Sequence, residues 1–368
     1  MKILELCVAY PNSKGFSKLS YVKVRNHYYR EEGICDITVL NFSLPDGEYE
    51  IDRIKVISLA CYKQKYSDQV YDILICHAPN IRNHFLFLKK YQYRFPKIVF
   101  FFHGHEVLSI RKEYPAPYNY QKIRGLKQLF SPIYDSFKFY LWHRYFTKQT
   151  DNVHLVFVSE WIRNKFEEYV GLNLAEIKAQ NHLIYNGVSK KFENESYDTH
   201  IEKEYDFITI RSNLDEPKYA VDVVNNLAWA NPKYKFLLVG KGDFFSHFQK
   251  ASNIEQIERY LNPKEVTDLL NRSKCGLMPT KNDTQGIMAC EMATFGMPLI
   301  TSDIDVCKVV FAGFSNVSYI SNKKRANLDI ILKYIKPSDN KNMKYSYNNT
   351  ILKETELLKT LAGEMLMK

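Results

Sequence analysis

The sequence lacks any long apolar run. Of its 368 residues, 45% are hydrophobic and 25% are charged, which are the averages of soluble globular proteins. The longest apolar strings are short ones such as residues 98–102, whereas a membrane-spanning helix needs about 18 to 20 apolar residues. Residues 1–8 place an acidic residue inside a very short apolar stretch, which is typical of a strand and not of a signal peptide. We therefore expect a cytoplasmic protein that is not integral to the membrane.

Paired cysteines are also missing. The seven cysteines form no Cys-x-x-Cys pair, are odd in number and mostly lie within apolar strings, as buried reduced thiols do. The sequence therefore indicates neither a zinc site nor a disulfide framework.

Acidic residues are scarce between positions 81 and 150. In this segment 13 Lys or Arg residues accompany three acidic residues, so it can account for the whole net charge of +10. Aromatic residues are interleaved with the basic ones, as in 85–95 and 137–146. The mixture suits an anionic membrane surface, which is the interpretation we favour. The alternatives are single-stranded nucleic acid, a partner that we do not expect, and two helices that simply expose their charges.

Short apolar, β-rich runs alternate with longer helical stretches along the chain. This pattern predicts βα units around parallel sheets, and the length predicts two α/β domains. We expect domains over 1–190 and 191–345, followed by a C-terminal helix within 346–368. The expected strands are 2–8, 36–40, 71–76, 97–102, 154–158, 205–210, 235–239, 275–278 and 298–301.

Residues 261–303 carry the most informative local pattern. Asn262, with a proline next and Glu265 three residues on, predicts a helix start. A strand over 275–278, a loop over 279–285 and a second helix that ends before Gly296 follow.

Glu291 is the one carboxylate of this second helix, among apolar neighbours. A buried carboxylate costs several kcal/mol unless it is partnered, and two hydroxyls of a ligand would partner it. Ile287 lies one turn earlier on the same face. The amides at the start of this helix could therefore hold a phosphate while Glu291 binds a sugar.

A family resemblance follows from these residues. Residues 283–291, Asp-Thr-Gln-Gly-Ile-Met-Ala-Cys-Glu, resemble the E-x7-E region of the retaining GT-B glycosyltransferases of family four, the glycosyl transferases group 1. Residues 184–188 resemble the Asn-Gly-Val turn between the domains of that family, and 238–243 resemble its Val-Gly-x-Gly strand end. Arg211 and Lys218 match its diphosphate-binding arginine and lysine. The first half of the chain matches only loosely.

The resemblance implies a GT-B fold, in which two Rossmann-like domains face each other across a cleft and the C-terminal helix packs back on the first domain. It implies that Arg211 and Lys218 hold the donor diphosphate, that Glu291 binds the ribose and that Asp283 contacts the donor sugar. The residues assigned to nucleotide-sugar binding are Gly286, Ile287, Glu291, Gly240 and Gly15.

No metal is needed in this scheme, because two cations and a helix N-terminus can stabilise a departing nucleoside diphosphate. We therefore expect no metal and no cofactor, the donor being a UDP- or GDP-linked sugar. Asp303 and Asp305 form a D-x-D string, as in metal-dependent transferases, but follow a strand of the second sheet in a context that already fits GT-B.

The acceptor side is marked by His103. This residue follows the strand 97–102 and resembles the acceptor-side histidine of the family, at the edge of a parallel sheet where ligands bind. The alternative is a loop histidine whose ring nitrogens are satisfied locally. His77 and Ser159 also follow strands and are weaker candidates.

Two departures from the family pattern leave a second function open. The first glutamate of the family is here Asp283, and its Gly-Gly loop is reduced to Asn-Ser-Lys-Gly at 12–15. We expect a bacterial retaining glycosyltransferase that acts on a glycan acceptor, preferably lipid-linked, in capsule or O-antigen type polysaccharide synthesis at the inner face of the plasma membrane. The alternative is a non-catalytic GT-B partner protein of a glycosyltransferase complex.

Overall fold

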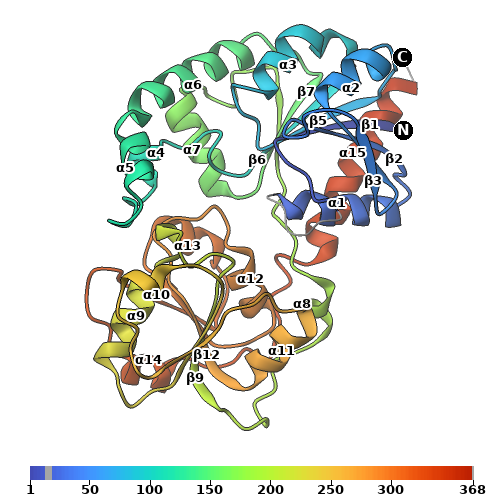
Figure 1. The fold of residues 1–368 in the computed structure, drawn as a ribbon. Helices are drawn as coiled ribbons and strands as arrows, with labels where there is room; N and C mark the ends of the chain where they lie inside the picture. The colour runs from blue at the N-terminus through green and yellow to red at the C-terminus, as the bar shows by residue number, and fades with distance from the viewer. Residues whose placement is uncertain (13–18, 367–368) are drawn as a thin grey trace. The chain divides into compact units, whose positions relative to one another are not determined.

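The chain forms two compact α/β units (Figure 1). The computed structural model describes residues 1–12 and 19–366. Unit 1 contains Met1–Leu108, Ile133–Tyr185 and Asn348–Lys368, and unit 2 contains Ser109–Pro132 and Asn186–Tyr347. The segment Ser109–Pro132, which the sequence analysis placed in the first domain, is thus grouped with unit 2.

Unit 1 is built on an eight-stranded sheet. Its strands are β1 Lys2–Cys7, β2 Asp36–Asn41, β3 Glu48–Ile51, β4 Ile54–Ile57, β5 Ile73–His77, β6 Lys97–Phe102, β7 Val153–Phe157 and β8 Gln180–Leu183. Their order is β3-β4-β2-β1-β5-β6-β7-β8, and every neighbouring pair is parallel except β3 with β4. All six residues of β6 are buried, as expected for a parallel strand covered on both faces.

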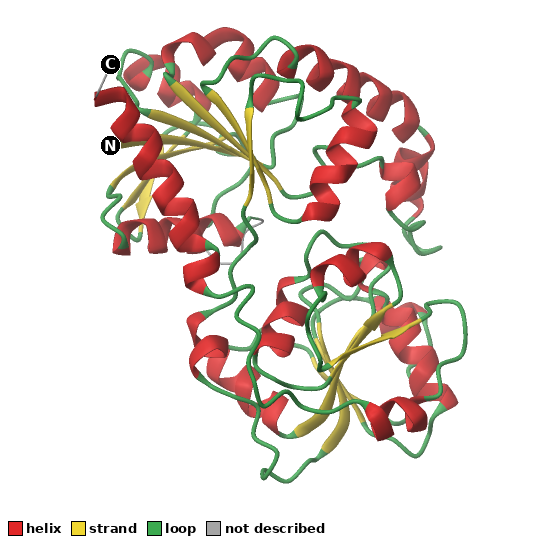
Figure 2. Ribbon diagram, turned by 180° about the vertical axis from the view of Figure 1, so that it is seen from behind, coloured by secondary structure: helices red, strands yellow, loops and turns green. Residues whose placement is uncertain are grey.

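Helices cover both faces of this sheet (Figure 2). They are α1 Ser20–Glu31, α2 Leu59–Cys61, α3 His84–Tyr91, α6 Ser131–Phe146, α7 Glu160–Val170 and α15 Ile351–Leu366, with the turns η1 Tyr62–Tyr66 and η2 Gln92–Arg94. Leu358 and Leu361 of α15 belong to the same apolar core as Ile75 of β5. Glu354 of α15 also accepts a hydrogen bond from the buried Arg25 of α1 at 3.0 Å. The expected return of the C-terminal helix to the first domain is confirmed.

Unit 2 is built on a six-stranded, fully parallel sheet. Its strands are β9 Tyr205–Ile210, β10 Phe236–Val239, β11 Ile254–Ile257, β12 Ser273–Met278, β13 Leu299–Ser302 and β14 Val317–Ile320. Their order is β11-β10-β9-β12-β13-β14. Its helices are α4 Ile110–Glu113, α5 Lys122–Leu129, α8 Lys190–Asn194, α9 Val221–Ala230, α10 Phe244–His247, α11 Pro263–Asn271, α12 Ile287–Thr294, α13 Asp305–Val310 and α14 Leu328–Tyr334, with the turn η3 Pro217–Tyr219; the turn η4 Tyr347–Asn349 leads back to unit 1.

The helix start predicted at Asn262 is confirmed. Asn262 caps α11, its side chain accepts the Glu265 N–H at 3.0 Å, and the Glu265 side chain accepts the Asn262 N–H at 2.8 Å. Such a capping box satisfies two amides that the helix itself leaves unpaired.

Each sheet has one point at which strand addition changes direction. In unit 1 this point lies between β1 and β5, and in unit 2 it lies between β9 and β12. Open α/β sheets bind ligands beyond the carboxyl ends of the strands at such a switch point. The topology therefore gives each unit one preferred place for a ligand. No helix within residues 1–12 and 19–366 has the length and apolar character that crossing a bilayer requires.

Candidate functional site

Arg211 lies at the switch point of unit 2. It directly follows β9, and its Nη2 donates to the Pro279 carbonyl, directly after β12, at 2.6 Å. The side chain is 8% exposed, and its Nε has no hydrogen-bond partner among the residues described. Burial lowers the pKa of Arg211, while the nearby Asp283 carboxylate raises it. A buried cation with an unused donor is suited to an anionic ligand.

The ring of Tyr219 lies close to both expected cations, Arg211 and Lys218. Its ring centroid lies 5.0 Å from Arg211 Cζ and 4.9 Å from Lys218 Nζ. The negative face of an aromatic ring attracts cations, so Tyr219 offsets part of the repulsion between the two. Ala220 follows in the left-handed region at φ 52°, a conformation that a non-glycine residue adopts at some cost.

The loop after β12 is hydrogen-bonded to the backbone of Lys218, one of the two cations. The Lys218 carbonyl accepts hydrogen bonds from the Lys281 N–H and the Thr280 hydroxyl, both at 2.8 Å. The Thr280 N–H donates to Ser302 Oγ of β13 at 2.8 Å. Residues 218 and 280–281 are therefore held in one arrangement before a ligand arrives.

Asp283 lies in the same loop, half-buried and close to Arg211. Its Oδ1 accepts the Thr284 N–H at 2.8 Å. Gly286 has φ +71°, and a Cβ there would lie 3.3 Å from Asp283 Oδ2. Arg211, Asp283 and Gly286 line a common cavity of about 10 Å³, the space of about one water molecule.

The N-terminus of α12 opens beside these residues. Gly286 is the cap residue and offers no side chain to cap the helix, and Ile287 is its first residue. Unpaired amides and the helix dipole favour a bound anion at this position.

Glu291 is buried on α12, as its apolar neighbours predicted, with 9% of its surface exposed. Its Oε1 accepts the Ser189 N–H at 3.2 Å. Burial raises the pKa of Glu291 to about 7, against a smaller lowering by the Ser189 amide. A carboxylate with few partners in an apolar setting gains strongly from ligand hydroxyls.

Gln285 is a positioning residue that the sequence analysis missed. Its Oε1 accepts the Asn186 N–H at 2.8 Å, and its Nε2 donates to the Asn186 carbonyl at 2.7 Å. This double contact fixes the turn at 186–188, three residues before the Ser189 amide that Glu291 binds. The contact joins positions 99 residues apart, so no local pattern reveals it.

Gly240 packs closely against the backbone of Arg211. A Cβ at Gly240 would lie 2.3 Å from the Arg211 carbonyl oxygen and 2.8 Å from Leu214 Cδ2. A side chain at this position would therefore displace the backbone of Arg211. A direct contact of Gly240 with a ligand stays a prediction.

The switch point of unit 1 carries neutral groups instead of free cations. His103 follows β6 and is half-buried, and His77 ends β5 and is fully buried; desolvation lowers the pKa of each well below its usual range. Glu5 Oε1 lies 3.9 Å from His77 Nε2, and burial raises the pKa of Glu5 to about 8. His103 Nε2, both His77 nitrogens and Glu5 Oε1 lack hydrogen-bond partners within the described part of the chain. At least one ring nitrogen of His103, Nε2, is therefore not satisfied by the described residues.

The other predicted positions have partners of their own or lie outside the described residues. Gly15 lies outside the described residues. Ser159 caps α7, where its Oγ accepts the Ile162 N–H at 3.3 Å. Asp303 pairs with Lys308 at 2.7 Å. Residues 1–12 and 19–366 contain no group of three or more His, Cys, Asp or Glu arranged to hold a metal ion.

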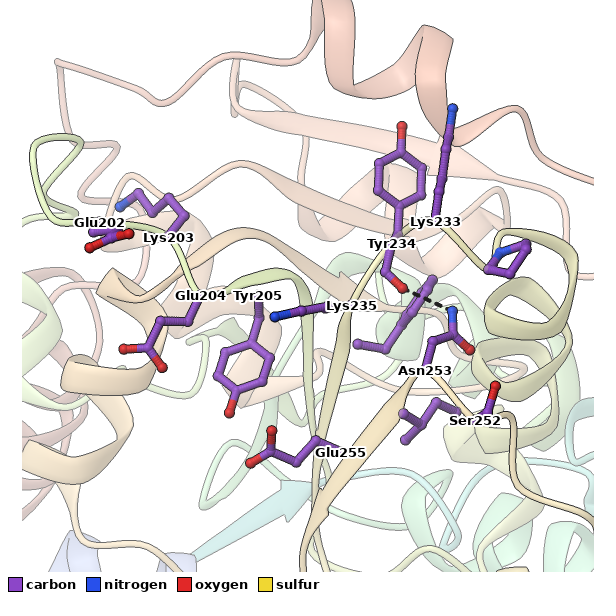
Figure 3. A pocket seen from close by; sticks show the side chains of 13 residues that line it. Glu202, Lys203, Glu204, Tyr205, Lys233, Tyr234, Lys235, Ser252, Asn253 and Glu255 are labelled. Carbon is purple, nitrogen blue, oxygen red and sulfur yellow. Dashed lines mark hydrogen bonds between the residues drawn. The ribbon is translucent and has the colours of Figure 1, made fainter.

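A larger hollow lies at the opposite edge of the unit 2 sheet. It measures about 740 Å³ and is lined by the starts of β9, β10 and β11 (Figure 3). Two of its polar side chains already have partners: Asn253 Nδ2 donates to the Tyr234 carbonyl at 2.9 Å, and Lys233 pairs with Asp329 at 2.7 Å. The hollow faces away from the switch point and gives no reason to assign it a ligand.

Comparisons with known proteins agree with this picture. Residues 208–332 match the family described as Glycosyl transferases group 1. Among curated protein sequences none matches this chain. Many solved structures do match it over nearly the whole length.

Three of these structures illustrate the likeness. Sucrose-phosphate synthase from Thermosynechococcus elongatus is similar with a TM-score of 0.70 at 10% identity, covering 99% of this chain and 100% of that one. An alpha,alpha-trehalose-phosphate synthase (UDP-forming) from Burkholderia vietnamiensis has a TM-score of 0.62 at 11% identity, with coverage of 99% and 98%. WaaG, a glycosyltransferase involved in lipopolysaccharide biosynthesis, has a TM-score of 0.58 at 12% identity, with coverage of 98% and 93%.

At such low identity these structures establish the fold, which is GT-B as predicted. The family match falls on unit 2, the unit that contains Arg211, Lys218, Asp283 and Glu291. The chain thus has a GT-B fold, and its residues 208–332 are similar to the family Glycosyl transferases group 1.

Proposed function

We propose that this protein transfers a sugar from a UDP- or GDP-linked donor to a lipid-linked glycan acceptor, with retention of configuration and without a metal ion. The observation that carries the proposal is the buried Arg211 at the switch point of unit 2, whose Nε is unused among the described residues. The pathway that we favour is bacterial cell-surface polysaccharide synthesis of the capsule or O-antigen type.

The residues of unit 2 are assigned roles by what each can offer. Arg211 and Lys218 neutralise the donor diphosphate, and the first amides of α12, at Ile287, add further donors. Glu291 accepts hydrogen bonds from the ribose hydroxyls. Asp283 faces the donor sugar from the loop that ends at Gly286.

The chemical step follows from these contacts. The bond between the anomeric carbon and the departing phosphate oxygen breaks, and the acceptor hydroxyl forms a new bond on the same face of the sugar. The proton of that hydroxyl passes to the departing phosphate oxygen. Because negative charge accumulates on the diphosphate as the bond breaks, Arg211 and Lys218 bind it more tightly in the transition state than in the ground state.

Donor hydrolysis tests the proposal most broadly. The purified protein would be incubated with a panel of UDP- and GDP-sugars, without acceptor, in the presence and absence of a chelator. We expect slow release of UDP or GDP from one donor at a rate that the chelator leaves unchanged. A strict requirement for manganese would contradict the metal-free scheme.

The same assay separates the enzyme from a non-catalytic partner protein. An enzyme binds and hydrolyses its donor, whereas a partner protein with a degenerate site binds a nucleotide without turnover or does not bind one at all. Tight UDP or GDP binding with no release from any donor, even after addition of membrane lipid extract, would favour the partner protein.

A further inference from the structure

Helix α5 presents an apolar face to solvent. Ile123, Leu126, Leu129 and the adjacent Phe130 are 60 to 73% exposed. Residues spaced by three, four or seven positions share one face of an α-helix, so these four side chains form a single stripe. No residue of α5 is buried.

The polar groups around α5 attach it to unit 2. Gln121 Nε2, at the start of the helix, donates to the Asp215 carbonyl at 2.7 Å. Arg124 Nη2 pairs with Glu216 at 2.5 Å, and the Tyr120 hydroxyl donates to Asp215 at 2.6 Å. The helix is therefore fixed through its polar side, with its apolar stripe left without a protein partner among the described residues.

Helix α3 shows the ordinary arrangement by comparison. It buries His84, Phe87, Leu88 and Tyr91 and exposes Lys89 and Lys90. Helix α3, in the basic and aromatic stretch 85–95, thus buries most of its large apolar side chains. Helix α5 buries none of its residues and offers apolar side chains to solvent.

The charge around α5 indicates what covers it. Lys122 and Lys127 are exposed and have no ion-pair partner within residues 1–12 and 19–366. The chain contains no acidic residue from position 114 to 134. A second copy docked on this stripe would bring like charges together, whereas an anionic lipid surface would accept both the lysines and the apolar side chains.

Several other basic residues of the segment 81–150 form ion pairs, so their charge is partly neutralised within the protein. Lys138 is 2% exposed and pairs with Asp135 at 2.9 Å. Lys97 pairs with Glu364 and Arg94 with Asp68. Lys122 and Lys127 of α5 lie beside four exposed apolar side chains, whereas Lys89 and Lys90 of α3 lie beside one, Leu86.

We propose that α5 is the element by which this protein docks on an anionic lipid surface. Ile123, Leu126 and Phe130 enter the boundary between headgroups and acyl chains, and Lys122 and Lys127 contact the headgroup phosphates. The proposal rests on the proposed function for its purpose, because docking would bring a lipid-linked acceptor to the enzyme.

Vesicle flotation with matched variants tests it. The wild type should float with vesicles containing phosphatidylglycerol and not with pure phosphatidylcholine. Leu126→Ser combined with Phe130→Ser, and separately Lys122→Glu combined with Lys127→Glu, should each lower the bound fraction about tenfold or more. The matched controls on α3, Leu86→Ser and Lys89→Glu combined with Lys90→Glu, should change it less than twofold.

Two further readouts make the result decisive. Donor hydrolysis without vesicles should be the same in all variants, because α5 is exposed. A wild type that hydrolyses no donor would refute the proposed function but would not affect the flotation result. Equal effects of the α3 and α5 variants, or a wild type that never floats, would overturn the proposal. So would a wild-type dimer in sedimentation that Leu126→Ser with Phe130→Ser converts to a monomer, because the stripe would then bind a second copy.

Discussion

The two switch points of this protein share a topology and differ in charge. At the switch point of unit 2, Arg211 and Lys218 approach one tyrosine ring and Arg211 keeps an unused donor. At that of unit 1, burial lowers the pKa of both His77 and His103, so that both rings are neutral at physiological pH. Sheet topology offers a place for a ligand in each unit, whereas the side chains favour an anion in unit 2 and a neutral polar molecule in unit 1.

This difference fits a transferase with unlike substrates. The donor carries two negative charges on its diphosphate, whereas a sugar acceptor presents hydroxyls at the reacting end. A substitution at one switch point should therefore leave ligand binding at the other unchanged.

The largest effect is expected from Arg211→Ala. It should lower kcat/KM for donor hydrolysis by about 3 to 4 kcal/mol, or 100-fold to 1000-fold, because the contact strengthens as charge develops on the diphosphate. Arg259→Ala, a control on an exposed arginine paired with Glu265, should leave the rate unchanged. His103→Ala should also spare donor hydrolysis, and equal losses in His103→Ala and Arg211→Ala would remove the distinction between the two units.

Glu291→Gln should alter how stability depends on pH. Because burial raises the pKa of Glu291 to about 7, its contribution to stability is complete below its unfolded pKa of about 4.5 and is lost as pH rises through 7. That loss amounts to about 3 kcal/mol. Urea unfolding at pH 5 and pH 8 should show the wild type losing stability over this interval relative to the variant.

Glu5→Gln supplies the matched control in unit 1, since burial raises the pKa of Glu5 to about 8. Both variants should flatten the pH dependence of stability, but only Glu291→Gln should weaken UDP or GDP binding. Nucleotide affinity that falls equally in both would show that Glu291 acts only on the stability of the fold.

Asp283→Asn should produce an intermediate effect on activity. Asparagine keeps an oxygen for the Thr284 N–H, which Asp283 accepts at 2.8 Å, so thermal stability should change little. The lost charge should lower kcat/KM by about 2 kcal/mol, the scale of a hydrogen bond to a charged group. An active enzyme that tolerates the change without loss would place the sugar contact elsewhere.

Tyr219→Leu should give the smallest effect, about 1 kcal/mol or fivefold in donor affinity, because it removes the ring that both cations approach. Tyr219→Phe keeps the ring and should behave like the wild type. If the two variants weaken donor binding equally, the hydroxyl of Tyr219 matters and not its ring face.

Much of the fold could be predicted from apolar runs in the sequence. All nine predicted strands are present, and the strands that were missed are β3, β4, β8, β11 and β14. The missed strands are short, and β3 and β8 have no buried residue, so they lack the apolar run that marks a central parallel strand.

Interactions between distant parts of the chain could not be predicted from apolar runs. The segment 109–132 joins unit 2 through Tyr118, which packs against the core of that unit and donates to Asp222 at 3.2 Å. Lys138, counted among the basic residues of 81–150, is buried and donates to the carbonyls of His105 and Leu108, 33 and 30 residues away. Neither outcome has a local signal, because each depends on which residues fold against one another.

The candidate donor site likewise contains residues that the sequence predicted and residues that it did not. Glu291 was found because a lone carboxylate in an apolar helix demands a partner, and Arg211 and Lys218 were found through the family resemblance. Gln285 was missed because its contact with Asn186 joins positions 99 residues apart. Tyr219 adjoins Lys218 in sequence, but no pattern shows that its ring also faces Arg211. A search for aromatic and amide side chains next to motif residues would have identified both as candidates.

Equilibrium binding of nucleotides tests the central claim most directly. Calorimetric titration would compare UDP with UMP, or GDP with GMP, in the wild type, in Arg211→Ala and in His103→Ala. The account predicts that the wild type and His103→Ala prefer the diphosphate at least tenfold and that Arg211→Ala loses this preference. An unchanged preference in Arg211→Ala, or its loss in His103→Ala, would contradict the assignment of the donor to the switch point of unit 2.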